Sequence, residues 1–483
     1  MPGPGCAPAR IGIVGALALS LAVFSGIATA VLPPPVARAF VAAGVPLTSI
    51  GVVVEEVGQD EPLFAYGADR SMNPASVMKL VTTFAALELL GPDYRWKTEA
   101  YLGGPLDHGT LQGDLILKGY GDPKTTIEQW ESFIATLRAQ GLARVAGDLV
   151  LDRSHFRLPP HDPARFDGDA LRPYNVGPDA LLVNFKAVRF VFAPAADGTG
   201  TAVRVEPPLP QVTLGPPPRL AGGDCNDWRG TLRAAFADRG TSASASFAGA
   251  YPARCGERDW YVALLDAPAY VLGMFTASFR AAGGEFAGGV REGRAPPGAV
   301  PFATLTSPPL ADIIRDVNKL SNNVMARQVF LTLATVGHPP PATADRAAAT
   351  VREWLRGRML RLPGLVLENG SGLSRHERIS AKGLARLLAA ADASRVKDEF
   401  ATSLAIAAVD GTVEKRFQNG SVAGQALLKT GTLEGVKALA GYVTNVEGRR
   451  YIVVALVNHP NAAAAQPALD TLVQWVHRNA GVR

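Results

Sequence analysis

The sequence changes character between about residues 101 and 266, and this change limits the fold more than any other feature does. Short strand-like pieces such as "GDLILKGYGDP", "VAGDLVLDRSHF" and "TAVRVEPP" alternate there with turns rich in proline and glycine. At 483 residues the chain also exceeds the size at which a single hydrophobic core keeps growing. We therefore expect two packed units, one of which is a β-rich inserted region of residues 99–267 made of two subdomains.

The segments on either side of the insertion, residues 31–98 and 268–483, predict the other unit. "LTSIGVVVEEVG" and "EPLFAYGAD" alternate like two paired strands, and "ALLKTGTLEGVKALAGYVT" and "YIVVALVNH" do the same near the C-terminus. Long amphipathic patterns between these strands predict helices, as does the end of the chain from about Pro467. The expected fold is α/β (α+β), with an antiparallel sheet built from both ends of the chain and flanked by helices.

The first 30 residues have the order of a secretory signal. Arg10 precedes the apolar run "IGIVGALALSLAVFSGI", and the small residues "ATA" precede "VLPPP", which favours cleavage after Ala30. A permanent membrane anchor is the alternative, but the run is short for a membrane span. We expect residues 1–30 to be removed and the rest of the chain to be exported to the periplasm.

Export decides how the cysteines are interpreted. Cys6 would leave with the signal, so that Cys225 and Cys255 remain. Two cysteines in an exported protein favour a disulfide, here one that closes a loop of about 30 residues. Two free, buried thiols are the alternative.

The charges of the chain do not favour nucleic acid as a partner. The formal net charge of +5 is spread along the sequence, and no run of Lys and Arg is interleaved with aromatic residues. We expect no nucleic-acid partner, no metal and no cofactor. The basic balance leaves peripheral association with an anionic polymer or membrane open.

The first candidate for chemistry is Ser76 with Lys79, near the start of a helix predicted from Asn73 to Gly91. A serine hydroxyl needs a base to become a nucleophile, and a lysine three residues later lies on the same helical face. The spacing by itself is a weak signal, because Ser394 and Lys397 match it too. To act as a base, Lys79 must be neutral, which predicts burial or a second cation beside it.

Two further motifs supply polar groups at distinctive positions. In "LLKTGTLEG", Lys429 and Gly431 share one face of a predicted strand, with Thr430 and Thr432 on the other. Taken in isolation, the "KTG" triplet would also be explained by an ordinary strand with a solvated lysine. In "KLSNNVMARQ", Ser321 and Asn323 interrupt a helical pattern and offer a hydroxyl and an amide.

The three motifs together resemble a known group. Serine-x-x-lysine, serine-x-asparagine and lysine-threonine-glycine follow one another in the order found in penicillin-recognising D,D-peptidases and serine β-lactamases. With "RPYNVGPDALLVNF", "ENGSGLSRHERIS" and "VDGTVEKRF", most of the mature chain resembles the D-alanyl-D-alanine carboxypeptidase/endopeptidase family, the DacB-like class C low-molecular-mass penicillin-binding proteins. The resemblance implies the penicillin-binding transpeptidase/β-lactamase-like fold with a large insertion.

The resemblance also implies roles for these residues. Ser76 would attack the D-Ala-D-Ala bond of a peptidoglycan stem peptide with Lys79 as general base, and β-lactams would be covalent inhibitors. The other implied roles are proton transfer to the leaving amine through Ser321 near Lys429, binding of the substrate amide by Asn323, binding of the terminal carboxylate by Thr430 and Thr432, and an oxyanion hole from the N–H groups of Ser76 and Thr432.

Some features of the sequence leave other interpretations open. The second motif reads Ser-Asn-Asn where an aspartate is frequent in the middle, and we expect little effect from this change. A serine β-lactamase is an alternative function, although no Glu-x-x-Leu-Asn segment is present. A non-catalytic wall-binding protein and a transpeptidase are further alternatives.

We interpret "ENGSGLSRHERIS" as a tight turn near the site, and the His and Asp residues around Pro159 as a polar loop rather than a metal site.

Overall fold

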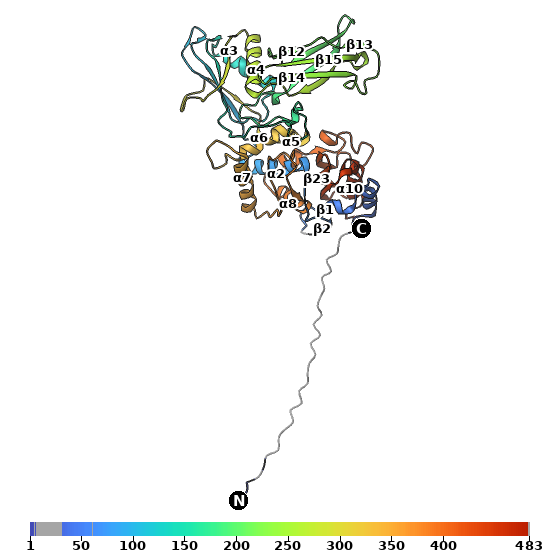
Figure 1. Cartoon of the computed structure of the whole chain (residues 1–483). Helices are drawn as coiled ribbons and strands as arrows, with labels where there is room; N and C mark the ends of the chain where they lie inside the picture. Colours follow the sequence, from blue (N-terminus) through green and yellow to red (C-terminus); the bar gives the residue numbers. More distant parts are fainter. Residues whose placement is uncertain (4, 6–30, 60, 482–483) are drawn as a thin grey trace.

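The computed structural model describes residues 1–3, 5, 31–59 and 61–481, which form two units stacked end to end (Figure 1). The apolar run and cleavage site of the predicted signal lie outside the described residues. In the described part of the chain, no helix is both long enough and apolar enough to cross a membrane.

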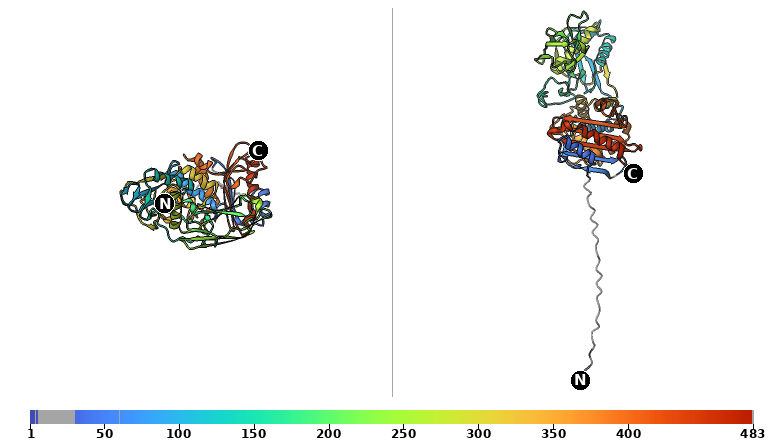
Figure 2. Two further views of the ribbon diagram at one scale, coloured as in Figure 1. Left: turned by 90° about the horizontal axis from the view of Figure 1, so that it is seen from above. Right: turned by 90° about the vertical axis from the view of Figure 1, so that its right-hand side faces the viewer.

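The first unit is organised by a six-stranded antiparallel sheet built from both ends of the chain, as predicted (Figure 2). Neighbouring strands are antiparallel throughout. In spatial order the strands are β2 (Pro62–Tyr66), β1 (Ile50–Glu56), β24 (Arg450–Asn458), β23 (Val436–Thr444), β22 (Ala426–Leu433) and β21 (Ala405–Ile406).

Helices cover both faces of this sheet because its strands are apolar on both sides. Along β24, Ile452 and Val454 belong to one apolar core, whereas Val453 and Ala455 belong to the core on the opposite face. The second of these cores includes α1 (Pro34–Ala42) and α10 (Gln466–Asn479). The first includes α2 (Lys79–Leu90), α5 (Leu310–Lys319), α6 (Asn323–Leu333), α7 (Ala344–Gly357), α8 (Ala381–Asp392) and α9 (Lys397–Thr402).

The inserted unit is β-rich, as predicted, and contains two groups of sheets. One group consists of a five-stranded and a four-stranded sheet with two helices: β18 (Val290–Glu292), β9 (Leu149–Asp152), β7 (Leu115–Gly119), β4 (Lys97–Leu102) and β19 (Ala303–Thr306); β17 (Glu285–Phe286), β8 (Arg144–Val145), β6 (Thr110–Leu111) and β5 (Leu106–Asp107); α3 (Ile127–Ala139) and α4 (Ala267–Ala281). The other consists of β11 (Thr201–Glu206), β10 (Val188–Pro194) and β16 (Arg258–Val262), with β12 (Val212–Leu214), β15 (Ala243–Pro252), β13 (Arg219–Ala221) and β14 (Leu232–Asp238).

One apolar core joins both groups of the inserted unit. It contains Leu117 of the first group and Phe247 of the second, together with Phe275 of α4. The disulfide predicted between Cys225 and Cys255 is present in the second group, with a Cα–Cα distance of 5.1 Å. The two groups therefore share their buried surface, although each has its own sheets.

Several elements beyond residue 267 pack or pair with the inserted unit. Helix α4 packs into its core, and β18 and β19 pair with β9 and β4 of its five-stranded sheet. We therefore propose residues 97–306 as the inserted unit, in place of the predicted 99–267. After α4, residues 285–306 form short strands, whose partners lie more than 100 residues away and are invisible to a local pattern.

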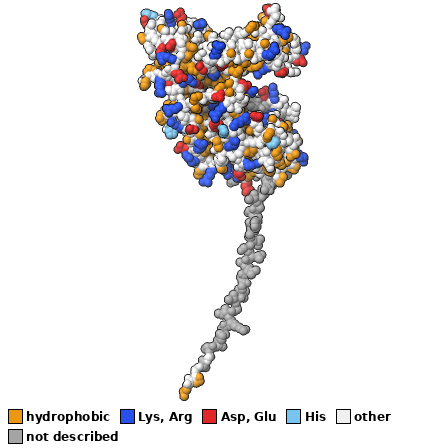
Figure 3. All heavy atoms as spheres, in the orientation of Figure 1, with side chains coloured by type: hydrophobic (Ala, Val, Ile, Leu, Met, Phe, Trp, Pro, Cys, Tyr) orange, Lys and Arg blue, Asp and Glu red, His pale blue; other side chains and the backbone are white. Residues whose placement is uncertain are grey.

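A waist separates the two units, and basic and acidic side chains are interspersed over the face shown in the space-filling view (Figure 3). Helices α5 and α6 lie on the side of the first unit that meets the inserted unit (Figure 1). The break between these two helices therefore lies near the waist; it carries Ser321, and Asn323 is the first residue of α6.

Candidate active site

Ser76 lies on a tight turn that side-chain amides hold in place. Asn73 accepts a hydrogen bond from the Ala75 N–H at 2.8 Å, and Asn458 of β24 accepts one from the Asn73 N–H at 2.8 Å. Ala75 has a φ of 47°, a backbone conformation that non-glycine residues seldom adopt. Ser76 follows in a 3₁₀ turn, Ala75–Met78, and the α-helix α2 begins only at Lys79, later than predicted.

Lys79 is fully buried and lies among three oxygen atoms. Its Nζ is 3.0 Å from Ser76 Oγ and 2.6 Å from Asn323 Oδ1, and it also donates to the Ser371 carbonyl. Burial, and next the nearby charge of Lys429, lower the pKa of Lys79 well below its usual value. Lys79 is thus favoured in its neutral form, as the sequence argument requires.

The arrangement around Lys79 orients the neutral amine. A neutral lysine has two N–H groups and one lone pair. Asn323 Oδ1 and the Ser371 carbonyl oxygen can only accept, so they occupy the two N–H groups. The lone pair is then left for the hydroxyl of Ser76, which is the geometry of a serine and its general base.

Ser321 and Lys429 form the second polar pair of the site. Ser321 has a φ of 57° between α5 and α6, which confirms the predicted break in the helical pattern. Lys429 Nζ lies 2.9 Å from Ser321 Oγ and donates to the Thr430 carbonyl at 2.8 Å. Burial lowers the pKa of Lys429 to about 7. The middle residue of the motif, Asn322, caps α6 by accepting the Met325 N–H at 3.0 Å.

Strand β22 passes close to the Ser76 turn because residue 431 is glycine. A Cβ atom at Gly431 would lie 2.6 Å from the Pro74 carbonyl and 3.1 Å from the Ser76 nitrogen. Thr430, on the other face, has its hydroxyl 2.7 Å from that of Thr412, and Thr432 is exposed. The structure therefore brings the three predicted motifs to one place.

Several parts of the site were not predicted from the sequence. Asn458, Thr412 and the Ser371 carbonyl come from segments far from the motifs, and backbone carbonyls carry no signal in the sequence. The predicted tight turn at "ENGSGLSRHERIS" does pack against the site. The other serine-x-x-lysine match has no such surroundings, because the Ser394 hydroxyl donates to the Ala391 carbonyl at the end of α8.

The predicted polar loop is built from local hydrogen bonds. Asp167 accepts from Tyr174 and Asn175, and His161 pairs with the Asn175 carbonyl at 2.7 Å. Across the described ranges, no group of three His, Cys, Asp or Glu side chains is placed to hold a metal ion.

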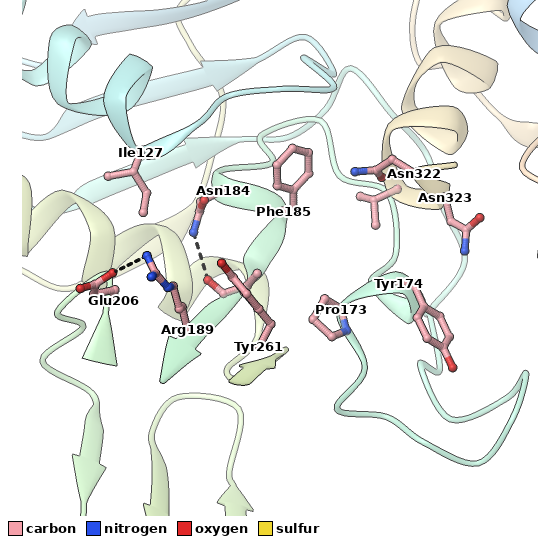
Figure 4. Close-up of a pocket in the computed structure, with 12 residues that line it drawn as sticks. Ile127, Pro173, Tyr174, Asn184, Phe185, Arg189, Glu206, Tyr261, Asn322 and Asn323 are labelled. Carbon is pink, nitrogen blue, oxygen red and sulfur yellow. Dashed lines mark hydrogen bonds and ion pairs between the residues drawn. The ribbon is translucent and has the colours of Figure 1, made fainter. Parts of the chain in front are cut away.

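A cleft of about 430 Å³ opens beside Asn323, between the two units (Figure 4). Asn322 and Asn323 line it from the start of α6, and Phe185 and Tyr261 line it from the inserted unit. At its far end Arg189 pairs with Glu206 at 3.1 Å. The site is therefore continuous with a groove whose opposite wall belongs to the inserted unit.

Comparison with known proteins agrees with this geometry. The model of the D-Ala-D-Ala carboxypeptidase 3 (S13) family matches residues 41–479. The chain belongs to this family. This match confirms the resemblance seen in the motifs. The activity of the chain is that of a serine-type D-Ala-D-Ala carboxypeptidase.

Relatives match the carboxypeptidase over most of its length. The D-alanyl-D-alanine carboxypeptidase DacB of Haemophilus influenzae is 26% identical over 428 residues, 85% of this chain and 85% of that protein. A D-alanyl-D-alanine carboxypeptidase of an Actinomadura species is 31% identical over 447 residues, 88% of this chain and 80% of the relative. The crystal structure of penicillin binding protein 4 (dacB) from Haemophilus influenzae matches with a TM-score of 0.74 at 25% identity, covering 91% of this chain and 99% of that one, which confirms the predicted fold class.

Proposed function

We propose that Ser76 is the nucleophile of the carboxypeptidase and that Lys79 is its general base. The observation that supports this most directly is the set of contacts around Lys79, which leaves its lone pair for the Ser76 hydroxyl. A lysine that is fully buried and lies beside a second lysine is neutral more readily than an exposed one. It can therefore take the proton of Ser76 as the serine attacks.

The reaction then follows from the positions of the remaining groups. Ser76 Oγ bonds to the carbonyl carbon of the penultimate D-alanine, and the N–H groups of Ser76 and Thr432 stabilise the negative oxygen that forms. The peptide C–N bond breaks as Ser321, which lies against Lys429, passes a proton to the leaving amine. Water next hydrolyses the acyl-enzyme and restores Ser76.

Strand β22 supplies the groups for binding the substrate carboxylate. Lys429 contributes positive charge, and the hydroxyls of Thr430 and Thr432 are donors along the same strand. The Nδ2 group of Asn323 remains for the substrate amide, because its Oδ1 accepts from Lys79. These groups bind the two sides of the bond that Ser76 attacks.

The groove between the units gives room for a longer substrate. It starts at Asn323 and offers amide, hydroxyl and apolar surfaces, which suit a stem peptide rich in amides and methyl groups. We propose that it receives the stem peptide on the acyl side of the bond, and that cross-linked stems are cleaved as well as terminal D-alanine.

The surroundings of the enzyme follow from its substrate. We propose that the mature protein works in the periplasm on peptidoglycan, with peripheral association at the membrane, and that β-lactams acylate Ser76. A crystal structure of the Haemophilus influenzae protein is a complex with a β-lactam.

The same site also suits a serine β-lactamase, but it does not favour a non-catalytic wall-binding protein. A serine β-lactamase would use the same acylation groups and differ in rapid deacylation. A non-catalytic wall-binding protein would not need two buried lysines in hydrogen-bond contact with two serines.

The test is the intact mass of residues 31–483 after brief exposure to benzylpenicillin. We expect one adduct on the parent enzyme, none on Ser76→Ala, and one on the matched control Ser394→Ala, because Ser394 has the same motif spacing outside the site. An adduct on folded Ser76→Ala would exclude Ser76 as the nucleophile. Loss of penicillin without an adduct would support the β-lactamase.

A further inference from the structure

Glu377 is a fully buried carboxylate for which the proposed reaction has no use. Its side chain is 0% exposed. Oε1 accepts the backbone N–H groups of residues 368, 369 and 370 at 3.1, 3.0 and 2.8 Å, and Oε2 accepts that of residue 372 at 2.9 Å. Four converging N–H donors form a cradle for an anion. Glu377 thus fixes the conformation of the loop at residues 368–372.

This loop is pressed against the segment that carries Ser76 and Lys79. The Ser371 carbonyl accepts from Lys79, and the Gly370 carbonyl accepts from Thr82 Oγ1 at 2.6 Å. Gly372 has a φ of 80°, and a Cβ atom there would lie 1.9 Å from the Ala75 carbonyl. The close fit leaves little freedom for the position of the Ser371 carbonyl.

We propose that Glu377 is a positioning residue for the reaction: by holding residues 368–372 it places the Ser371 carbonyl, which orients Lys79 toward Ser76. This inference rests on the proposed roles of Ser76 and Lys79. Glu377 touches neither substrate nor Ser76 in this account, and it acts only through the loop.

The chemistry of the side chain explains why a carboxylate stands at position 377. Both oxygens receive only N–H donors, so a glutamine would turn an NH₂ group toward at least one N–H group. An aspartate would keep the charge, but its side chain is one methylene shorter. Both substitutions are expected to loosen the Ser371 carbonyl.

The charge of Glu377 also reaches the base. The charged groups that face Glu377 are Lys79 at the start of α2 and Arg327 on α6, and Glu368 of the same loop also lies near Arg327. The negative charge of Glu377 acts to raise the pKa of Lys79, against burial and the charge of Lys429. Removal of this charge therefore lowers the pKa of Lys79 and lets it stay neutral at lower pH.

The experiment compares Glu377→Gln with the matched control Glu368→Gln, an exposed carboxylate in the same loop. The measurements are the rate of acylation by benzylpenicillin across a pH series and thermal unfolding of each variant. For Glu377→Gln we expect acylation to be slower by about 10- to 100-fold, part of the usual contribution of a general base. We also expect the limb of the profile that rises with pH to move to lower pH. Glu368→Gln should match the parent enzyme in its acylation rate and in its pH profile.

Gly372→Ala separates the effect of the position of the loop at residues 368–372 from the effect of the charge of Glu377. The added Cβ displaces the loop but keeps the charge of Glu377, so we expect slow acylation with an unshifted pH profile. A folded Glu377→Gln enzyme with the parent rate and profile would overturn the proposal. If Glu377→Gln does not fold, parent-like acylation by folded Gly372→Ala would overturn it, and unfolding of both variants would make the role structural and overturn it too.

The outcome for Ser76→Ala keeps the two proposals apart. If that variant is still acylated, the proposed function fails whatever Glu377 does. If Ser76→Ala is inert and the Glu377 variants behave like the parent, only the positioning role fails.

Discussion

The two units of the carboxypeptidase differ in what their buried groups do. The unit that carries the site buries Lys79 and Lys429, which hydrogen-bond to segments distant in the sequence, and Glu377, which the neighbouring loop at residues 368–372 satisfies. The inserted unit buries mainly apolar and aromatic side chains, such as Phe190 and Phe192, and its buried carboxylates pair with partly exposed basic side chains, as Glu99 does with Lys97. The comparison indicates that chemistry depends on a few buried polar contacts in one unit, whereas the other unit contributes a stable wall.

Substitution of Lys429 tests whether the chemistry depends on the buried polar contacts of the first unit, and it has the largest expected effect. Lys429→Ala should lower kcat/KM for a D-Ala-D-Ala peptide by about 10²- to 10³-fold, because a preorganised positive charge at the site is lost. In the free parent enzyme Lys429 loses its proton as pH rises through about 7, so kcat/KM should fall there. Lys429→Ala should lack this basic limb, as a pH series of initial rates would show.

The control for this prediction is Lys382→Ala. Lys382 pairs with Asp69 at the surface, 3.1 Å away, and its loss should leave both the rate and the profile unchanged. A basic limb that persists in Lys429→Ala would assign that limb to another group.

Removal of the disulfide tests whether the inserted unit contributes only a stable wall. Cys225→Ser with Cys255→Ser should lower the free energy of unfolding by about 2 to 4 kcal/mol, since the bond closes a loop of 30 residues. The rate of acylation by benzylpenicillin at low temperature should stay that of the parent, because the bond lies in the inserted unit. Denaturant unfolding and the acylation rate measure the two effects, and slower acylation in the folded variant would show that the units are coupled.

Substitution of Arg189 sharpens the comparison at the groove and has the smallest expected effect. Arg189→Ala should raise KM for a stem pentapeptide by roughly two- to tenfold, the usual range for one polar contact. Acylation by benzylpenicillin should not change, because Arg189 lines the end of the groove away from Asn323. Arg204→Ala is the matched control, because Arg204 also contacts Glu206 and Glu257 but does not line the groove. Equal KM values for the two variants would argue against binding of the stem in the groove.

Much of the site could be predicted because its side chains fall in short motifs. The strand at Lys429 and the helix break at Ser321 follow from local patterns, and the need for a neutral Lys79 follows from the chemistry of serine. A turn before the helix was predicted from Asn73, but the structure extends it as a 3₁₀ turn through Ser76 to Met78, which the pattern does not reveal. The boundary that we propose for the inserted unit depends on β18 and β19, which pair only with distant strands and so give no local signal.

The sequence by itself determined the alternating strands, the helices between them and the motifs that carry the proposed reacting groups, because these depend on neighbours along the chain. Only the tertiary structure decided that Asn323, Ser371 and Lys429 surround the pair of Ser76 and Lys79, and that Glu377 holds the loop behind them. The pKa of a lysine and the direction of its lone pair depend on burial and on contacts across hundreds of residues. Such contacts exist only once the sheet has joined the two ends of the chain.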